Sequence, residues 1–209
     1  KINLVPSPGY NHNIGISRLY DHLILGINTL RWVSKTKKID LPDFVFIGYP
    51  PIESCFALSF WFKFLGIPFC IDVKDQWPII FLQKYKGIKR LIFKVILFPY
   101  FLAASYSLRW ATFLTSITPS FLKWSQDFSN NFSTLNRVLY LVPNKTKLDQ
   151  EKINDANSWW KNKIGIDINK KNKFIFAGNI CNAYDFNDLI KALNSKIIKE
   201  LDIEIIICG

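Results

Sequence analysis

Two short apolar runs on either side of a helix-length segment constrain the fold of this chain more than any other feature. The runs are Phe44–Tyr49 and Phe69–Val73, and the segment between them, Glu53–Leu65, ends before Gly66 and Pro68. Short apolar runs of this kind are typical of buried parallel strands, and glycine followed by proline stops a helix. The pattern predicts a βαβ unit with parallel strands and a right-handed crossover.

The alternation continues along the chain, so the expected fold class is α/β. Further strands are expected at residues 1–5, 112–118, 138–142, 173–177 and 203–208. Further helices are expected at residues 18–34, 119–128, about 154–163 and 186–194. The first of these helices has an apolar row on one face, formed by Leu19, Leu23, Ile27, Leu30 and Val33.

A change in composition after Pro143 predicts a domain boundary. Residues 1–143 would form a first domain, residues 144–172 a polar linker with a lead-in helix, and residues 173–209 the start of a second domain. Hydrophobic residues make up 49% of the chain and charged residues 21%, which is typical of a globular protein. The chain has no Met, begins in a strand-like run and ends on another, so we expect it to be an internal piece of a longer protein.

Positive charge is concentrated in the first part of the chain. The formal net charge is +11, and residues 1–149 hold 18 basic against 8 acidic residues, a net of +10. No acidic residue lies between Asp75 and Asp127, where seven basic residues fall: Lys84, Lys86, Lys89, Arg90, Lys94, Arg109 and Lys123. Such a region attracts phosphates.

A nearly unbroken apolar segment of 18 residues, Leu91–Leu108, is interrupted only by Lys94 and Pro99. Three interpretations are open: a buried or half-buried helix pair broken at Pro99, a surface that dips into a bilayer interface, and a true membrane span. Basic residues flank the segment on both sides and indicate no orientation for a span. Their combination with an apolar helix favours a monotopic surface over a span.

Four loops follow predicted strands: residues 6–18, 49–54, 74–78 and 178–184. The carboxyl ends of parallel strands share one edge of a sheet, where ligands bind in open α/β folds, so we expect the four loops to converge. The segment Asp72–Pro78 brings two carboxylates, an indole and a proline to this edge. An alternative is that this is a plain polar loop whose acids cap the next helix.

Four cysteines, Cys55, Cys70, Cys181 and Cys208, stand singly in apolar surroundings without metal or redox spacing. They are expected to be reduced core residues in a cytoplasmic protein, and no metal site is expected. Two glycosylation sequons, at Asn131 and Asn144, are expected to be chance matches in an Asn-rich chain.

Several segments that follow one another in a fixed order carry a family pattern. The most specific are the Asp75-Gln76-Trp77-Pro78 block and the Ala177-Gly178-Asn179 strand end. The others are Asp43–Pro51, Gly66–Pro68, Ile117–Ser120, Val142–Asn144 and Asp188–Ala192. Together they cover nearly the whole chain and resemble the family 4 glycosyltransferases of the GT-B fold, most closely those of bacterial surface-polysaccharide (O-antigen, capsule and exopolysaccharide) assembly.

The resemblance implies two Rossmann-like domains, the first holding the acceptor and the second a nucleotide-sugar donor, and sugar transfer with retention of configuration and without a metal or other cofactor. It makes Asp75 the catalytic carboxylate beside the transferred sugar. It implies acceptor or sugar contacts for Arg18, Pro51, Trp77 and Pro78, and contacts with the donor diphosphate for Gly178 and Asn179, where a residue without a side chain lets backbone amides approach phosphate.

The chain also departs from the family pattern. The family's first strand and glycine-rich loop would lie before Lys1, and its Glu-x7-Glu pair would lie after Gly209. The usual Asn-Gly after the boundary strand is Asn144-Lys145 here. The piece is therefore expected to be inactive by itself even if the parent protein is an enzyme.

The expected partners are a nucleotide-sugar donor, a lipid-linked or glycan acceptor, and an anionic membrane surface. The expected location is cytoplasmic and peripheral, on the inner face of the cytoplasmic membrane. Three alternatives stay open. A non-catalytic homologue would bind a membrane or a partner. The positive charge would fit a nucleic-acid-binding protein, but the sequence has no zinc spacing and no RNA-binding motif. A nicotinamide-dependent enzyme would need a glycine fingerprint after a strand, and no predicted strand in this sequence is followed by one.

Overall fold

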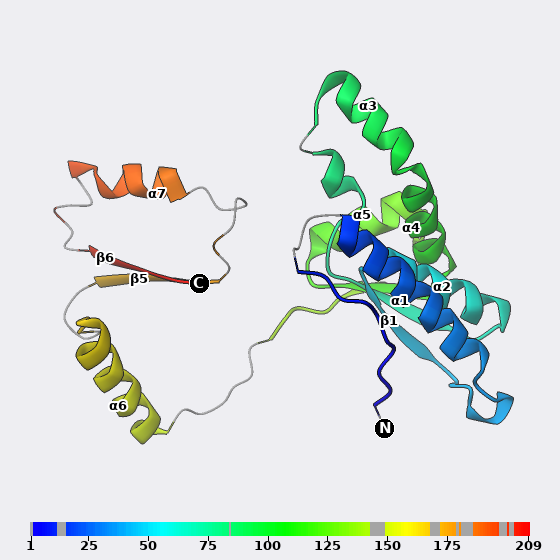
Figure 1. Cartoon of the computed structure of the whole chain (residues 1–209), viewed down its shortest axis with the longest axis horizontal. Helices are drawn as coiled ribbons and strands as arrows, with labels where there is room; N and C mark the ends of the chain where they lie inside the picture. The colour runs from blue at the N-terminus through cyan, green and yellow to red at the C-terminus, as the bar shows by residue number, and fades with distance from the viewer. Residues whose placement is uncertain are drawn as a thin grey trace. The chain divides into compact units, whose positions relative to one another are not determined.

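The computed structural model describes residues 2–11, 16–83, 85–142, 149–167, 172–178, 180, 186–196, 200 and 203–209 of the 209-residue chain. The chain divides into two compact units, Lys1–Val142 and Pro143–Gly209 (Figure 1). Unit 1 carries the larger sheet and most of the helices.

The core of unit 1 is a parallel sheet of four strands, β1 (Val45–Tyr49), β2 (Phe69–Val73), β3 (Phe113–Ser116) and β4 (Arg137–Val138). The strands lie side by side in chain order, with Val45 opposite Phe69 and Cys70 opposite Phe113. The predicted α/β class is confirmed, and this topology is compatible with a Rossmann-like fold.

β2 lies inside the sheet, and all five of its residues are buried. Even Asp72 is buried there, where its carboxylate accepts a hydrogen bond from Thr115 Oγ1 on β3 at 2.8 Å. Its second oxygen lies 3.5 Å from Lys74 Nζ. Because a buried charge must be partnered, these contacts let an acid occupy a central strand.

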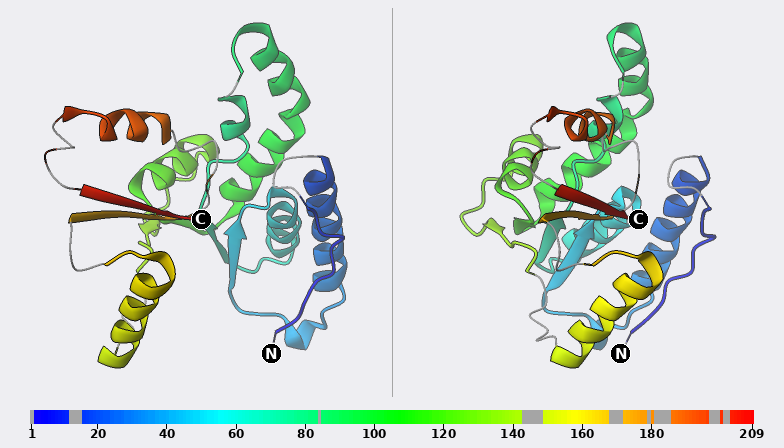
Figure 2. Two further views of the ribbon diagram at one scale, coloured as in Figure 1. Left: turned by 60° about the vertical axis from the view of Figure 1, so that its left-hand side comes forward. Right: turned by 90° about the vertical axis from the view of Figure 1, so that its left-hand side faces the viewer.

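The described residues of unit 1 form five α-helices: α1 (Ile16–Ser34), α2 (Ile52–Phe64), α3 (Gly87–Ile96), α4 (Phe98–Trp110) and α5 (Pro119–Ser129). Of the two short 3₁₀ segments described, η1 (Lys38–Asp40) lies between α1 and β1, and η2 (Ile79–Leu82) lies between β2 and α3. Helices α1 and α2 lie side by side, α2 also packs on α4, and α4 packs on α5 (Figure 2). The core joins strand residues such as Ile71 and Leu114 to helix residues such as Cys55 and Leu108.

The buried face of α1 agrees with its predicted apolar row only in part. Leu30 and Val33 of the row pack in the core. Leu19, Leu23 and Ile27 are each more than one third exposed, whereas His22 and Thr29 are buried. The reason is a close approach to α2 at Gly26, where an added Cβ would lie 3.0 Å from the backbone carbon of Glu53.

The apolar segment forms two helices rather than one. Helices α3 and α4 meet at Leu97 with a bend of 61°, two residues before the predicted break at Pro99. Proline in the first turn of α4 explains the break, because its ring clashes with the carbonyl four residues earlier. α3 buries no residue, and α4 buries Ala104, Ser107 and Leu108. No single helix in the described ranges is long and apolar enough to cross a membrane, although this bent pair passes on length and composition.

Two predicted strands are wrong in whole or in part. Residues 2–5 form no strand, and the segment that follows is held to α1 instead: Asn28 Nδ2 donates to the carbonyl oxygen of Pro6 at 3.0 Å. The strand expected at 138–142 is reduced to β4, because β3 ends at Ser116. The amide of Leu139 makes one last bond to the carbonyl of Ser116 at 2.8 Å.

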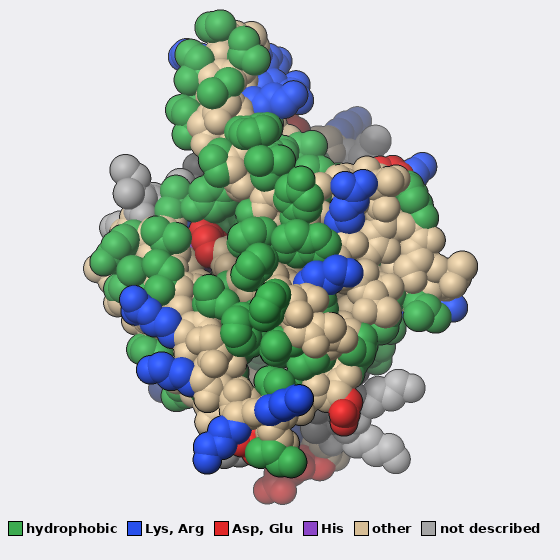
Figure 3. All heavy atoms as spheres, turned by 90° about the vertical axis from the view of Figure 1, so that its right-hand side faces the viewer, with side chains coloured by type: hydrophobic (Ala, Val, Ile, Leu, Met, Phe, Trp, Pro, Cys, Tyr) green, Lys and Arg blue, Asp and Glu red, His purple; other side chains and the backbone are tan. Residues whose placement is uncertain are grey.

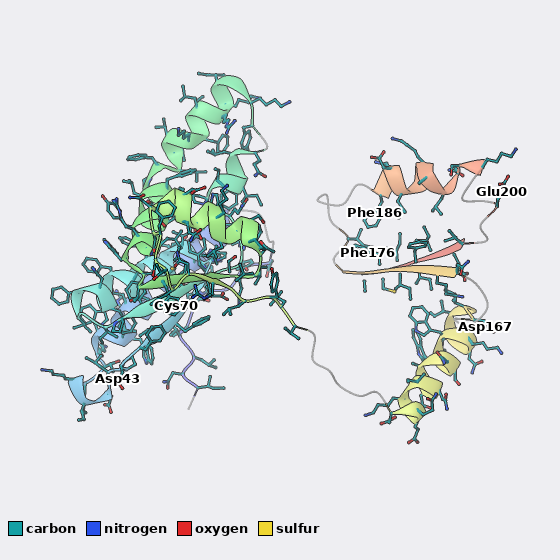
Figure 4. The ribbon with its side chains drawn as sticks, turned by 180° about the vertical axis from the view of Figure 1, so that it is seen from behind. Asp43, Cys70, Asp167, Phe176, Phe186 and Glu200 are labelled. Atoms are coloured by element: carbon teal, nitrogen blue, oxygen red, sulfur yellow. The ribbon has the colours of Figure 1, made fainter. Side chains whose placement is uncertain are left out.

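Unit 2 contains α6 (Gln150–Trp159), its π-helical continuation η3 (Trp160–Ile164), β5 (Asn172–Ala177), α7 (Phe186–Leu193) and β6 (Ile203–Cys208). β5 and β6 are parallel neighbours, so β5, α7 and β6 form a second βαβ unit. Phe176 of β5 meets Phe186 of α7 edge to face, at 5.4 Å between ring centroids (Figure 4). This contact packs the helix on its sheet.

Candidate functional site

The candidate site lies at the carboxyl ends of β1 and β2 in unit 1. The last residue of β1, Tyr49, is fully buried, and its hydroxyl donates a hydrogen bond to the carbonyl oxygen of Trp77. Trp77 is itself buried, and Pro78 behind it is completely buried. The peptide bonds Tyr49–Pro50, Pro50–Pro51 and Trp77–Pro78 are cis. The loop after β2 is therefore tied to the end of the neighbouring strand.

Arg18 and His22 lie against the indole of Trp77, and Tyr10 lies against both of them. We call these four residues the Trp77 cluster: Tyr10, Arg18, His22 and Trp77. The guanidinium carbon of Arg18 lies 4.6 Å from the Trp77 ring centroid and 5.6 Å from that of Tyr10. The centroid of the His22 ring lies 5.9 Å from that of Trp77 and 6.0 Å from that of Tyr10. A cation over an indole face is attracted by the ring quadrupole, so the cluster holds Arg18 in place.

A buried histidine and glutamate lie next to this cluster. His22 Nδ1 of α1 is 3.8 Å from Glu53 Oε2 in the first turn of α2, and both side chains are more than nine-tenths buried. Neither of these two atoms has a hydrogen-bond partner among the described residues. The other Glu53 oxygen accepts from the Tyr100 hydroxyl of α4 at 3.0 Å. Burial and the Glu53 charge raise the pKa of Tyr100 to about 12.

The two acids of the Asp72–Pro78 segment have different surroundings. Asp72 is buried in the sheet and hydrogen-bonded there. Asp75 is half-buried, and its Oδ1 accepts from the Gln76 amide at 2.7 Å, so the second oxygen is not used in that bond. Burial, with the charges of Cys55, Asp75 and Glu53, raises the pKa of Tyr49 well above its usual value. Of these two acids, Asp75 is the one placed to meet a ligand.

The remaining predicted site residues fall in two places. Pro51 is half-buried and directly precedes α2, beside the Trp77 cluster's end of the sheet. Gly178 lies after β5 in unit 2, where its amide donates to the carbonyl of Cys208 at 2.9 Å. Asn179 lies outside the described residues. The expectation that four loops follow strands of one sheet is wrong, because the described strands form two sheets and Gly178 follows a strand of the second.

Sequence reasoning did not single out Tyr10, His22, Glu53 or Tyr100 as site residues. One signal was present in the predicted helix at 18–34. Arg18, His22 and Gly26 recur every four residues, so they share a face that carries a cation, an imidazole and no side chain. Such a face fits close packing around a polar group better than it fits an apolar core.

An apolar cavity of about 330 Å³ lies between α1, α2 and α4. Its walls include Leu23, Ile27, Phe56 and Tyr100, and Glu53 is the charged side chain among the described residues that line it. A larger cavity of about 610 Å³, lined by residues such as Asp43 and Gly66, lies at the other end of β1 and β2. It is far along the strands from Asp75, so we do not assign the site to it.

The described cysteines form no disulfide. Cys55, Cys70 and Cys208 are free thiols, and Cys181 lies outside the described residues. Burial raises the pKa of Cys55 to about 12. The described parts of the chain contain no group of three His, Cys, Asp or Glu residues placed to hold a metal ion. Asn131 is buried, and its amide donates to the carbonyls of Leu108 and Ala111.

No protein-family model matches this chain, and a search of curated proteins finds no significant relative.

Proposed function

We propose that this protein is a retaining glycosyltransferase of the GT-B type, which transfers a sugar from a nucleotide donor to a lipid-linked or glycan acceptor in bacterial cell-surface polysaccharide biosynthesis. The observation that supports the proposal is the position of Asp75 and Trp77 shortly after the buried central strand β2, with Arg18 over the ring of Trp77. The carboxyl end of such a strand is where ligands bind in open α/β sheets.

Each of these side chains has chemistry suited to the reaction. The carboxylate of Asp75 would hydrogen-bond a sugar hydroxyl or stabilise positive charge at the anomeric carbon. Arg18 presents a planar, permanently charged fork that suits an acceptor phosphate. Trp77 holds Arg18 by its ring face, and Pro78 and Pro51 keep the loop and the start of α2 in position.

Donor binding is proposed for the βαβ unit of residues 172–208. Gly178 directly follows β5 and carries no side chain, so phosphate oxygens would approach the chain closely there, although its own amide donates to the carbonyl of Cys208. Asn179 would contribute beside it. The proposal needs no metal and no other cofactor, since the donor diphosphate would be held by backbone amides and basic side chains.

Asp75→Asn tests the catalytic role. The full-length protein is incubated with radiolabelled nucleotide sugars and extracted lipid-linked acceptors, and label in the lipid phase is measured. We expect Asp75→Asn to lower the transfer rate at least about tenfold, because the amide loses the charge that stabilises the transition state. Asp43→Asn, at the far end of β1, is the matched control and should keep the wild-type rate.

Unchanged transfer by Asp75→Asn would remove Asp75 from the mechanism. Absence of transfer with every donor, together with retained binding of acceptor lipid, would favour a non-catalytic homologue. Salt-dependent binding of RNA or DNA without acceptor binding would favour a nucleic-acid-binding protein.

The proposal includes a location. A lipid-linked acceptor lies in a membrane and nucleotide sugars are made in the cytoplasm, so we place the protein at the inner face of the cytoplasmic membrane as a peripheral protein.

A further inference from the structure

Helix α3 carries an exposed apolar row that no other described part of the chain covers. Its five members are Ile88, Leu91, Ile92, Val95 and Ile96, which recur at spacings of three and four residues and therefore share one face. Each is between 51% and 69% exposed. The helix is attached from another side, where Phe93 stacks on Tyr85 with ring centroids 4.0 Å apart. The apolar row thus faces away from the contact that holds α3.

The apolar surface continues past the bend into α4. Phe98, Leu102 and Tyr106 are four residues apart and each is more than 40% exposed. An exposed apolar surface that runs along two helices exceeds the scattered apolar residues of an ordinary surface, and such patches mark interaction sites. Figure 3 shows hydrophobic side chains gathered over the projecting helix and the helices below it.

Positive charge lies next to this row, on the other sides of α3. Lys89, Arg90 and Lys94 are exposed, and Lys86 directly precedes the helix. The sequence has no acidic residue from Gln76 to Gln126, so nothing within this stretch neutralises them. Figure 3 shows basic side chains beside the hydrophobic ones at the end of the projecting helix.

We propose that α3, with the exposed side of α4, is the surface by which this protein lies on an anionic lipid bilayer. The apolar row would enter the boundary between headgroups and acyl chains, and the basic side chains would lie at the level of the lipid phosphates. A helix with one apolar face and a basic opposite face binds in the plane of such an interface.

The length of α3 and the charge beside its apolar row favour an anionic bilayer as the binding partner. Ten residues of α-helix span about 15 Å, half of a hydrocarbon core of about 30 Å, so α3 lies on a bilayer and does not cross it. A nucleic acid would use the basic side chains and leave the apolar row in water. A bilayer that contains anionic lipid engages both faces.

The inference deepens the proposed function, because it assigns the membrane contact to a defined element, and it is tested without any sugar transfer. The protein is floated with vesicles of phosphatidylcholine alone or with 30% phosphatidylglycerol, at low and high salt. We expect binding to the anionic vesicles that exceeds binding to the neutral ones by at least about tenfold and that weakens as salt is raised.

Two pairs of matched variants separate the apolar and the basic contributions. Ile92→Ser with Val95→Ser should abolish most vesicle binding, whereas Ile39→Ser with Phe64→Ser, which changes two apolar residues that are even more exposed but lie on other elements, should not. Lys89→Gln, Arg90→Gln and Lys94→Gln together should weaken binding by about a hundredfold, at about fivefold per basic residue. The same change at Lys35, Lys37 and Lys38 should have a small effect.

Circular dichroism must show that each variant is folded, and all chosen positions are exposed, so folding should persist. Vesicle binding by the Ile92/Val95 variant at the wild-type level would overturn the inference. It would equally be overturned if the wild type bound no vesicles but formed dimers that the same variant dissociates, or bound RNA that only the Lys89/Arg90/Lys94 variant releases. Loss of sugar transfer with intact vesicle binding would count against the proposed function alone.

Discussion

At the scale of single residues, Glu53 connects the candidate site to the rest of unit 1. One oxygen faces His22 of α1 and the other accepts from Tyr100 of α4, so three helices meet at one carboxylate. A buried carboxylate is stable only when its charge is compensated. The bond from the Tyr100 hydroxyl compensates one Glu53 oxygen, and the other oxygen lies 3.8 Å from His22 Nδ1.

The Tyr100 bond predicts a dependence of stability on alkaline pH. Burial and the Glu53 charge raise the pKa of Tyr100 from 10.0 to about 12 in the folded protein. The folded state therefore holds this proton more tightly than the unfolded state does. The resulting stability is fully present below about pH 10 and is lost as the pH rises through 12.

Tyr100→Phe should remove this component. Urea unfolding at several pH values between 9 and 12 should show that the free energy of unfolding falls less with rising pH for Tyr100→Phe than for the wild type. At pH 9 the variant should be the less stable of the two, because it lacks the bond to Glu53. Tyr106→Phe, exposed on the same helix, should follow the wild-type curve. Identical slopes for all three proteins would contradict the assignment.

At the scale of elements, the packing of α1 on α2 depends on Gly26. An added Cβ would lie 3.0 Å from two Glu53 atoms and 3.1 Å from a third, so the helices would have to separate. Gly26→Ala should destabilise unit 1 by about 1–2 kcal/mol, since overpacking outweighs the better helix propensity of alanine. The measurement is the urea midpoint at constant slope.

Gly48→Ala is the control for this prediction. Gly48 lies in β1 with no atom near its added Cβ, so its substitution should change stability by less than about 1 kcal/mol. Stabilisation of the protein by Gly26→Ala would mean that α1 and α2 are farther apart than the structure places them.

Local patterns predicted most elements well. β2 and β6 have the predicted bounds, and α5 and α7 differ from theirs by one residue, because apolar runs, proline at a helix start and glycine after a helix act over a few residues. Residues 2–5 were misassigned because a short apolar run forms a strand only when a neighbour is available to pair with it. The core packing of Leu30 and Val33 on α1 was predicted correctly, but the burial of His22 and Thr29 was missed because it depends on the position of α2.

The candidate site was predicted in part for the same reason. Asp75, Trp77 and Arg18 were found because they follow strands or open a helix. His22 and Glu53 are 31 positions apart, and only the packing of α1 on α2 brings them together. The prediction that four loops lie at one edge of one sheet was wrong, because hydrophobic periodicity indicates where strands are but not how many sheets they form.

At the scale of the whole molecule, the main core lies entirely in unit 1. Its buried members fall between Val33 and Leu114, and the hydrophobic residues packed on them between Leu30 and Phe128. A polypeptide of residues 1–142 should therefore fold by itself. Its near-ultraviolet circular dichroism should show ordered aromatic side chains, and its thermal midpoint should match one transition of the longer chain.

Loss of the near-ultraviolet signal in that polypeptide, with helical signal retained, would indicate a collapsed state without fixed packing. It would mean that residues beyond 142 are needed to order this core.

The order of strands in unit 1 bears on how the protein is made. In the larger sheet, β2, β3 and β4 each pair with the described strand that precedes them in the chain. During synthesis on the ribosome, a newly emerged strand would find its partner already in place. The described sheet can grow by addition of strands at one edge, and no later described strand has to insert between two strands that formed earlier. Domains of this kind suit folding while translation is still under way.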